Sequence, residues 1–127
     1  MWHVSIQNYD FSFFYNPKEV ENISGYISLN LNSYFNKPLY FSYDSNTEGV
    51  SEILRNIGRF AERTQFVCLD NCSENLPIKN CSDNIVIIKE ENNTLIRQED
   101  NCIYILAEKE ETLKAADSFI FRVLGIV

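Results

Sequence analysis

Apolar and polar residues alternate along several short segments of the chain, the pattern of half-buried β-strands. Trp2, Val4 and Ile6 share one face of the first such segment, and a second strand follows a turn at residues 8–10. Further strand patterns occupy 25–31 (GYISLNL), 37–43 (KPLYFSY) and 65–69 (QFVCL). The polar turns ENN and EDN separate three more, at 85–90, 94–98 and 102–107, which predict a meander.

Two segments instead repeat their apolar residues at helical spacing. The first covers residues 47–63. Ser45, just before it, and Glu48 have the spacing of a capping box. The second covers 110–124, with Gly125 placed as its C-terminal cap. Pro17 predicts a short helical turn after the first two strands.

These elements predict one α+β domain over residues 1–127, a mainly antiparallel sheet with two amphipathic helices packed on it. The 127-residue length and the 45% hydrophobic content suit a single folded domain. The sequence has neither a signal peptide nor an apolar run of about 18 residues. Because it opens within a strand pattern, we expect a fragment lacking its N-terminal signal or anchor, so membrane attachment would come only through that missing anchor.

Charge and composition exclude several classes of function. The formal net charge is −7, so we expect no binding to nucleic acid or to anionic lipid surfaces. The chain has one histidine and four glycines, and it lacks the motifs of serine hydrolases, P-loop enzymes and zinc proteases. The sequence therefore predicts no catalytic residue, no cofactor and no resident metal.

The four cysteines carry the strongest chemical signal. Cys68, Cys72 and Cys81 fall within the stretch CLDNCSENLPIKNC, and Cys102 follows. A four-thiolate zinc site, a redox pair and free buried thiols remain alternatives, but the tight CxxC spacing of zinc and redox sites is absent. Disulfides are favoured because the number is even and the cysteines lie at strand ends and in loops. We prefer Cys68–Cys72 and Cys81–Cys102, since one strand running back between 81 and 102 brings both to the same end of the sheet.

Glycosylation acceptors accompany these cysteines. The motif Asn-x-Ser/Thr occurs four times, which agrees with an oxidising, extracytoplasmic compartment. With fifteen asparagines in the chain, some of these motifs are expected by chance. The acceptor positions are Asn22, Asn71, Asn80 and Asn92.

Three further features admit both a functional and a purely structural interpretation. Arg55, Arg59 and Arg63 are spaced four residues apart and form either an anion-binding stripe or a solvated helix face. The aromatic residues between 11 and 43 form either an exposed binding patch or ordinary strand packing. Asp117 in the last helix is either a catalytic acid or a partner of nearby backbone and Lys114.

Three segments together resemble a known family: YNPKEVENISG at 15–25, LPIKNCSDNIVIIKEENNTLIRQEDNCIYI at 76–105 and KAADSFIFRVLGI at 114–126. They are similar to an uncharacterised family of membrane-anchored, extracytoplasmic proteins of small-genome archaea. The chain would correspond to the soluble domain of that family without its leader. The resemblance implies a cell-surface location and an α+β fold, and it implies no activity.

The leading hypothesis is therefore a non-catalytic, disulfide-stapled domain that binds another protein or a cell-envelope component. One alternative is a carbohydrate-binding or carboxylate-dependent hydrolytic domain. Another is a cytosolic module stabilised by zinc. A pocket lined by facing carboxylates would favour an enzyme, whereas an exposed aromatic patch on the sheet would favour binding.

Overall fold

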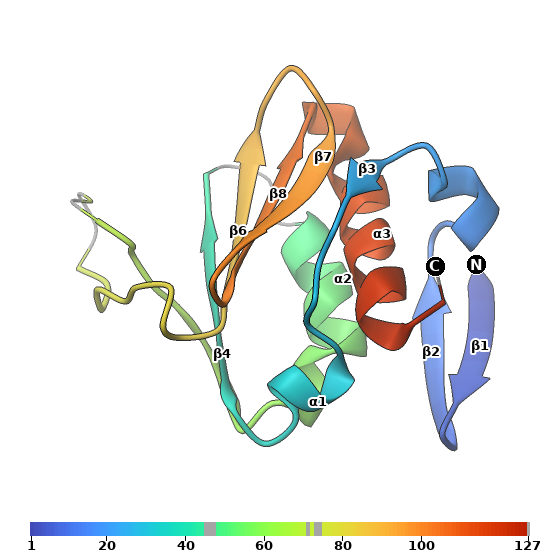
Figure 1. The fold of residues 1–127 in the computed structure, drawn as a ribbon, viewed down its shortest axis with the longest axis horizontal. Helices are drawn as coiled ribbons and strands as arrows, with labels where there is room; N and C mark the ends of the chain where they lie inside the picture. The colour runs from blue at the N-terminus through green and yellow to red at the C-terminus, as the bar shows by residue number, and fades with distance from the viewer. Residues whose placement is uncertain (45–47, 71, 73–74, 127) are drawn as a thin grey trace.

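The computed structural model describes residues 1–44, 48–70, 72 and 75–126, and it arranges them in three layers (Figure 1). A pair of helices lies between a large β-sheet and an N-terminal β-hairpin. The hairpin consists of β1 (Trp2–Ile6) and β2 (Tyr9–Phe13), paired antiparallel. The helices are α2 (Glu48–Asn56) and α3 (Thr112–Leu124). The α+β class and the two helices packed on a sheet are confirmed.

The large sheet has six strands in the order β3-β7-β8-β6-β4-β5. Their bounds are β3 (Ser24–Gly25), β4 (Pro38–Tyr43), β5 (Arg63–Phe66), β6 (Ile85–Glu90), β7 (Leu95–Glu99) and β8 (Cys102–Ala107). Only β7 and β8 pair antiparallel, whereas β3–β7, β4–β5, β4–β6 and β6–β8 are parallel. The sheet is thus mixed, and the expectation of a mainly antiparallel sheet is corrected.

The predicted meander over 85–107 is also corrected, because β8 lies between β6 and β7. The physical reason is burial on both faces. All four residues of the run IVII at 85–88 are 0–1% exposed. Val86 and Ile88 pack in the helix-facing core, while Ile85 and Ile87 belong to a second cluster. A continuous apolar run of this kind is typical of a central parallel strand.

The two helices end differently. Helix α3 stops where predicted, with Gly125 in the left-handed conformation at φ 74°. Helix α2 ends at Asn56, earlier than predicted. A separate 3-10 turn follows at Gly58–Phe60, and β5 begins at Arg63. The proposed cap residue Ser45 lies outside the described residues.

Two short segments connect the hairpin to the sheet. The turn at Pro17–Val20 forms as predicted, closed by reciprocal hydrogen bonds between Asn16 and Glu19. The predicted strand at 25–31 is wrong beyond its first residue, because only Ser24–Gly25 pairs with β7 and Leu31–Tyr34 forms the helix α1. A Cβ atom at Gly25 would lie 2.5 Å from the Ile96 carbonyl oxygen, so only glycine lets these backbones approach.

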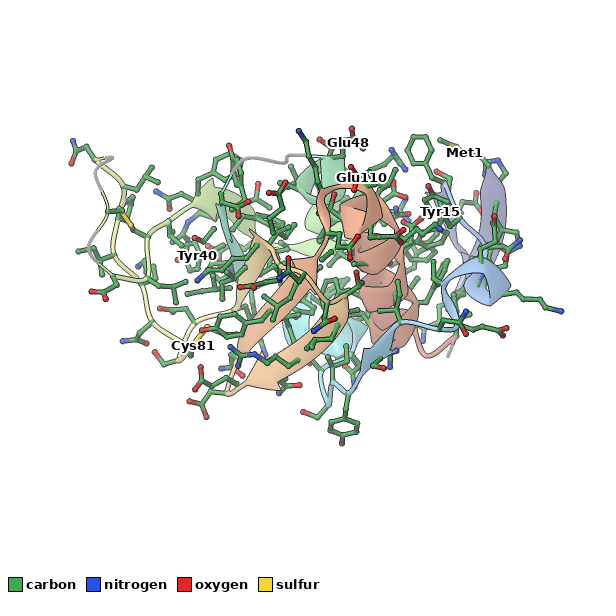
Figure 2. The ribbon with its side chains drawn as sticks, turned by 90° about the horizontal axis from the view of Figure 1, so that it is seen from above. Met1, Tyr15, Tyr40, Glu48, Cys81 and Glu110 are labelled. Carbon is green, nitrogen blue, oxygen red and sulfur yellow. A yellow bond between two sulfur atoms is a disulfide. The ribbon has the colours of Figure 1, made fainter. Side chains whose placement is uncertain are left out.

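The sheet face turned away from the helices is covered by the chain between β5 and β6. Tyr40, Ile85, Ile87 and Cys102 form a small cluster on this face with Val67, and Leu69 and Cys81 from the connecting loop pack on it. Tyr40 and Cys81 both lie on this side of the sheet in Figure 2. The loop between β5 and β6 therefore works as a cover rather than as a loose connection.

Candidate functional site at the carboxyl edge of the sheet

Both disulfides involve the loop that covers the sheet, and the second joins this loop to β8. The structure joins Cys68 to Cys72, with Cα atoms 6.4 Å apart, and Cys81 to Cys102, with Cα atoms 5.0 Å apart. Because β6 and β8 run parallel with Ile85 opposite Cys102, the two strands begin at one end of the sheet, as the preferred pairing requires. Pairing of the cysteines in this way disfavours a four-thiolate zinc site. Among the described residues, no group of three or more acidic, histidine or cysteine side chains is arranged to hold a metal ion.

A hollow of about 470 Å³ opens where β5 ends and β4 continues. Phe41, Tyr43, Phe66 and Leu76 line it, and we call these four residues the aromatic notch. The Tyr43 and Phe66 rings meet edge to face with centroids 5.3 Å apart. Tyr43, Phe66 and Leu76 are 37%, 42% and 36% exposed. The notch exists because Phe66 is the last residue of β5, whereas β4 extends two residues past the position paired with it.

The first disulfide forms part of the wall of the aromatic notch, since Cys68 and Cys72 also line the hollow. Cys68 is held from the other side by the loop itself. Its backbone N–H donates to the Pro77 carbonyl (2.9 Å), and its carbonyl accepts from the Lys79 N–H (2.8 Å). The covalent bond and this short pairing fix the segment that carries Leu76.

Beside the notch, the carboxyl ends of the neighbouring parallel strands are acidic. Glu90, Glu91 and Glu108 line a second hollow of about 330 Å³ together with Lys109, and all three glutamates are exposed. We call these three glutamates the acidic rim. Asp44 lies between the two features, where its carboxylate accepts a hydrogen bond from the Glu90 N–H (2.9 Å). In open α/β sheets, ligands bind outside the carboxyl ends of parallel strands, which makes this edge the first place to look for a site.

A polar hollow of about 380 Å³ lies at the opposite, amino-terminal end of the parallel strands, where Pro38, Asn84 and Asn101 are among its lining residues. Its amide side chains already serve the fold. Asn84 donates to the Ser33 carbonyl (2.9 Å), and Asn101 donates to the Ser82 carbonyl (3.1 Å). These contacts indicate a structural junction more than a ligand site.

The three arginines do not form a stripe on one helix, because α2 ends at Asn56 and Arg63 lies in β5. Each is engaged within the domain. The guanidinium of Arg59 lies 4.7 Å from the ring centroids of both Phe11 and Phe60. The hydrogen-bond acceptors of Arg55, Arg59 and Arg63 include the Glu52 carboxylate, the Asp10 carbonyl and the Tyr40 hydroxyl, respectively. This arrangement favours the structural interpretation of all three.

Asp117 is likewise tied to the fold. It is 0% exposed and accepts a hydrogen bond from the Tyr15 N–H (3.0 Å), which anchors the chain just after the hairpin to α3. Burial raises the pKa of the Asp117 carboxyl to about 7. Two buried side chains of α2, Glu52 and Asn56, bind the backbone of the hairpin segment in the same way. These polar residues hold the hairpin against the helices.

The predicted glycosylation acceptors Asn22, Asn80 and Asn92 are exposed, and Asn71 lies outside the described residues. The Asn80 side-chain oxygen accepts hydrogen bonds from the N–H (3.0 Å) and the hydroxyl (2.6 Å) of Ser82 within the same motif. Exposure makes the three described acceptors physically accessible, and it says nothing further about their use.

Sequence reasoning missed the aromatic notch as a site. Phe41 and Tyr43 were among the aromatic residues singled out between 11 and 43, but Phe66 and Leu76 were not. The available signal was Phe66 within the predicted strand at 65–69, followed by a cysteine-rich loop.

Comparisons with protein-family models, with curated proteins and with solved structures give no match for this chain. Within the described part of the chain, none of the helices is both long and apolar enough to cross a bilayer. The function must therefore be argued from the surface described above.

Proposed function

We propose that this protein is a non-catalytic, extracytoplasmic interaction domain that binds another protein through the aromatic notch. The observation that carries the proposal is the exposure of Tyr43, Phe66 and Leu76 around one hollow. Exposed aromatic clusters beside polar surface are typical of interaction sites, because a partner gains by covering them. The acidic rim supplies the polar surface on one side.

The location is supported by the two disulfides, since such bonds persist in oxidising compartments. It is also supported by the resemblance of the chain to anchored cell-surface proteins of small-genome archaea. Under this proposal the domain faces the outside of the cell and reaches the membrane through an anchor.

The carboxylate-dependent alternative would use the acidic rim. Its three glutamates are exposed to solvent, whereas a carboxyl group that acts as a general acid near neutral pH needs a desolvated setting. Among the described residues, the carboxyl with a strongly raised pKa is that of Asp117, which lies between helix and hairpin and away from this rim. The geometry thus favours binding over hydrolysis.

A site-specific cross-linking experiment tests the proposal. A photoreactive p-benzoylphenylalanine is placed at Phe66 in one variant and at Tyr26 in a matched variant, because Tyr26 is also an exposed aromatic residue, at 77%, but lies away from the notch. On irradiation of the producing cells, we expect a discrete cross-linked species from position 66 and none from position 26. Equal cross-linking from both positions, or none from position 66, would contradict the proposed binding surface.

The location is tested separately by labelling cysteine thiols with a membrane-impermeant maleimide after mild reduction of intact cells. Labelling of the partly exposed Cys72 and Cys81 is expected if the domain is outside the cell, whereas Cys102 is fully buried and should stay unlabelled while the protein is folded. Thiols that react without reduction, and only after lysis, would place the domain in a reducing compartment.

A further inference from the structure

The strand beside the aromatic notch is open on its outer side. β5 is the last strand of the sheet, and all four of its residues are exposed. Its backbone alternates in direction. The Val67 N–H donates to the Phe41 carbonyl on the β4 side (2.9 Å), so Arg63 and Gln65 also turn their N–H and C=O groups toward β4. Thr64 and Phe66, which alternate with them, turn these groups outward. An outer strand with free backbone groups is a template on which another extended segment can pair.

The open edge and the aromatic notch are continuous. Phe66 is paired with Phe41, and their ring centroids are 6.4 Å apart on the helix-facing side of the sheet. A strand added outside β5 places every second side chain on that same side. The side chain opposite Phe66 would then lie against the Phe66 ring at the mouth of the notch. A hollow of about 470 Å³ has room for one large apolar side chain.

The edge of β1 in the hairpin is also unpaired, but it lacks this combination. Its outward side chains are His3 and Ser5, and the hollow beside it is lined by polar residues together with Val4 and Phe11. The edge formed by β3 is only two residues long. Among the described strands, β5 is therefore the best platform for an added strand.

The charges around the site indicate the chemistry of the occupant. The acidic rim lies along the same carboxyl edge, joined to the notch through the hydrogen bond between Asp44 and Glu90. The whole chain carries a net charge of −7, so two copies repel each other at low ionic strength. A foreign segment with lysine or arginine next to its apolar anchor is attracted to the same surface.

We infer that β5 and the aromatic notch together bind an extended peptide segment of another protein by strand addition. The segment carries one large apolar or aromatic side chain, which enters the notch, and basic residues beside it, which face the acidic rim. This inference rests on the proposed function and specifies how the partner is recognised. Backbone hydrogen bonds to Thr64 and Phe66 supply the pairing, and the notch supplies the selectivity.

The test begins with a displayed library of random 12-residue peptides, selected against the oxidised protein. Selected peptides are then measured by calorimetry against the wild-type protein and three variants. Thr64→Pro removes an outward N–H, which an outer strand tolerates because the group bonds nothing within the sheet. Phe66→Ala removes the wall of the notch, and Tyr26→Ala is the control at an exposed aromatic residue elsewhere.

We expect selected peptides to share an apolar anchor flanked by basic residues. Thr64→Pro and Phe66→Ala should each weaken their binding about tenfold or more, while Tyr26→Ala leaves it unchanged. Because a proline variant can disturb the strand, the peptide is varied as well, with the wild-type protein as partner. N-methylation of alternate peptide amides should abolish binding for one set and spare the other, since a strand pairs through only one of its two edges.

Three results would overturn the inference. Peptides that need Phe66 yet tolerate N-methylation of both sets would rule out strand addition, while the interaction surface tested by cross-linking would stand. Selected peptides indifferent to both Thr64→Pro and Phe66→Ala would show that the site lies elsewhere. Concentration-dependent dimerisation that Thr64→Pro abolishes would identify the occupant of the edge as a second copy of this chain.

Discussion

Removal of the Cys81–Cys102 disulfide is the most direct perturbation of the loop that covers the sheet. The double variant Cys81→Ala/Cys102→Ala avoids a leftover thiol. The bond closes a loop with a sequence separation of 21, for which loop-closure entropy gives about 3 kcal/mol of stabilisation. For a domain of 127 residues, 1 kcal/mol shifts the melting temperature by about 4 °C. The oxidised variant should therefore melt about 12 °C below the oxidised wild type.

The assay is thermal unfolding followed by circular dichroism, with each protein measured with and without reductant. The matched control is Cys68→Ala/Cys72→Ala, which opens a loop with a sequence separation of only 4 and should cost about 2 kcal/mol. Under reductant, the wild type should fall close to the Cys81/Cys102 variant, because the benefit belongs to the bond. Cys102 is 0% exposed, so a residual difference of about 1 kcal/mol from lost packing is expected in the reduced state.

Two outcomes would refute this reasoning. If the Cys81/Cys102 variant and the wild type differ by the same amount with and without reductant, the loss comes from packing at Cys102 and not from the bond. If oxidised wild type, with both bonds verified by mass spectrometry, melts no higher than reduced wild type, the loop is already held by its contacts with the sheet.

Three further predictions follow from burial, exposure and charge. Because the raised pKa of Asp117, about 7, exceeds the unfolded value of about 4, unfolding releases a proton between these pH values, and stability should fall by up to about 4 kcal/mol as pH rises through that window. Asp117→Asn should flatten this dependence in urea titrations, whereas the exposed control Asp70→Asn should leave it intact; an unchanged slope in Asp117→Asn would assign the dependence to another group. Secretion from a glycosylating host should produce a mass shift, reversed by enzymatic deglycosylation, that maps to exposed acceptors, and a protein secreted without any glycan would contradict it; the described acceptors are Asn22, Asn80 and Asn92. With a net charge of −7, the protein should not shift DNA or RNA in gel mobility assays at ordinary salt. Tight, salt-sensitive binding would contradict this argument from net charge.

The helices were predictable because their signal is local. Helix α3 combines helical spacing with a terminal glycine, and both are properties of adjacent residues. Helix α2 was predicted too long because the apolar spacing continues through Phe60, although the chain changes to a 3-10 turn at Gly58. The apolar period reports which side of a segment is buried, and it does not report where the hydrogen bonds of a helix end.

The direction of the strands was not predictable from the same pattern. Alternation identifies a face, but parallel and antiparallel neighbours bury that face equally. The run at 85–88 held the missing information, since four consecutive buried residues indicate burial on both faces and hence a central strand. The pairing of Cys81 with Cys102 survived the error, because it required only that β6 and β8 begin at the same end of the sheet.

The candidate site depends on tertiary structure more than the fold does. The aromatic notch arises from a difference in length between two paired strands, so Phe66 and Tyr43 meet only after β4 and β5 are in register. For Asp117 the sequence suggested a functional site that the structure does not support. Its position beside the apolar face of a helix suggested a catalytic acid, whereas its hydrogen bond with Tyr15, distant in sequence, makes it an anchor for the hairpin.

The two disulfides have separable consequences under the proposed function. The Cys81–Cys102 bond joins the covering loop to the start of β8, at the far end of the sheet from the notch, so its loss should act on stability. The Cys68–Cys72 bond closes a much smaller loop and contributes less to stability, yet both of its cysteines line the hollow. A bond in this position keeps the wall of the notch rigid. A rigid wall lowers the entropy cost of ordering the site when a partner binds. The position of the Cys68–Cys72 bond, beside Tyr43 and Phe66, therefore fits the proposed binding at the notch.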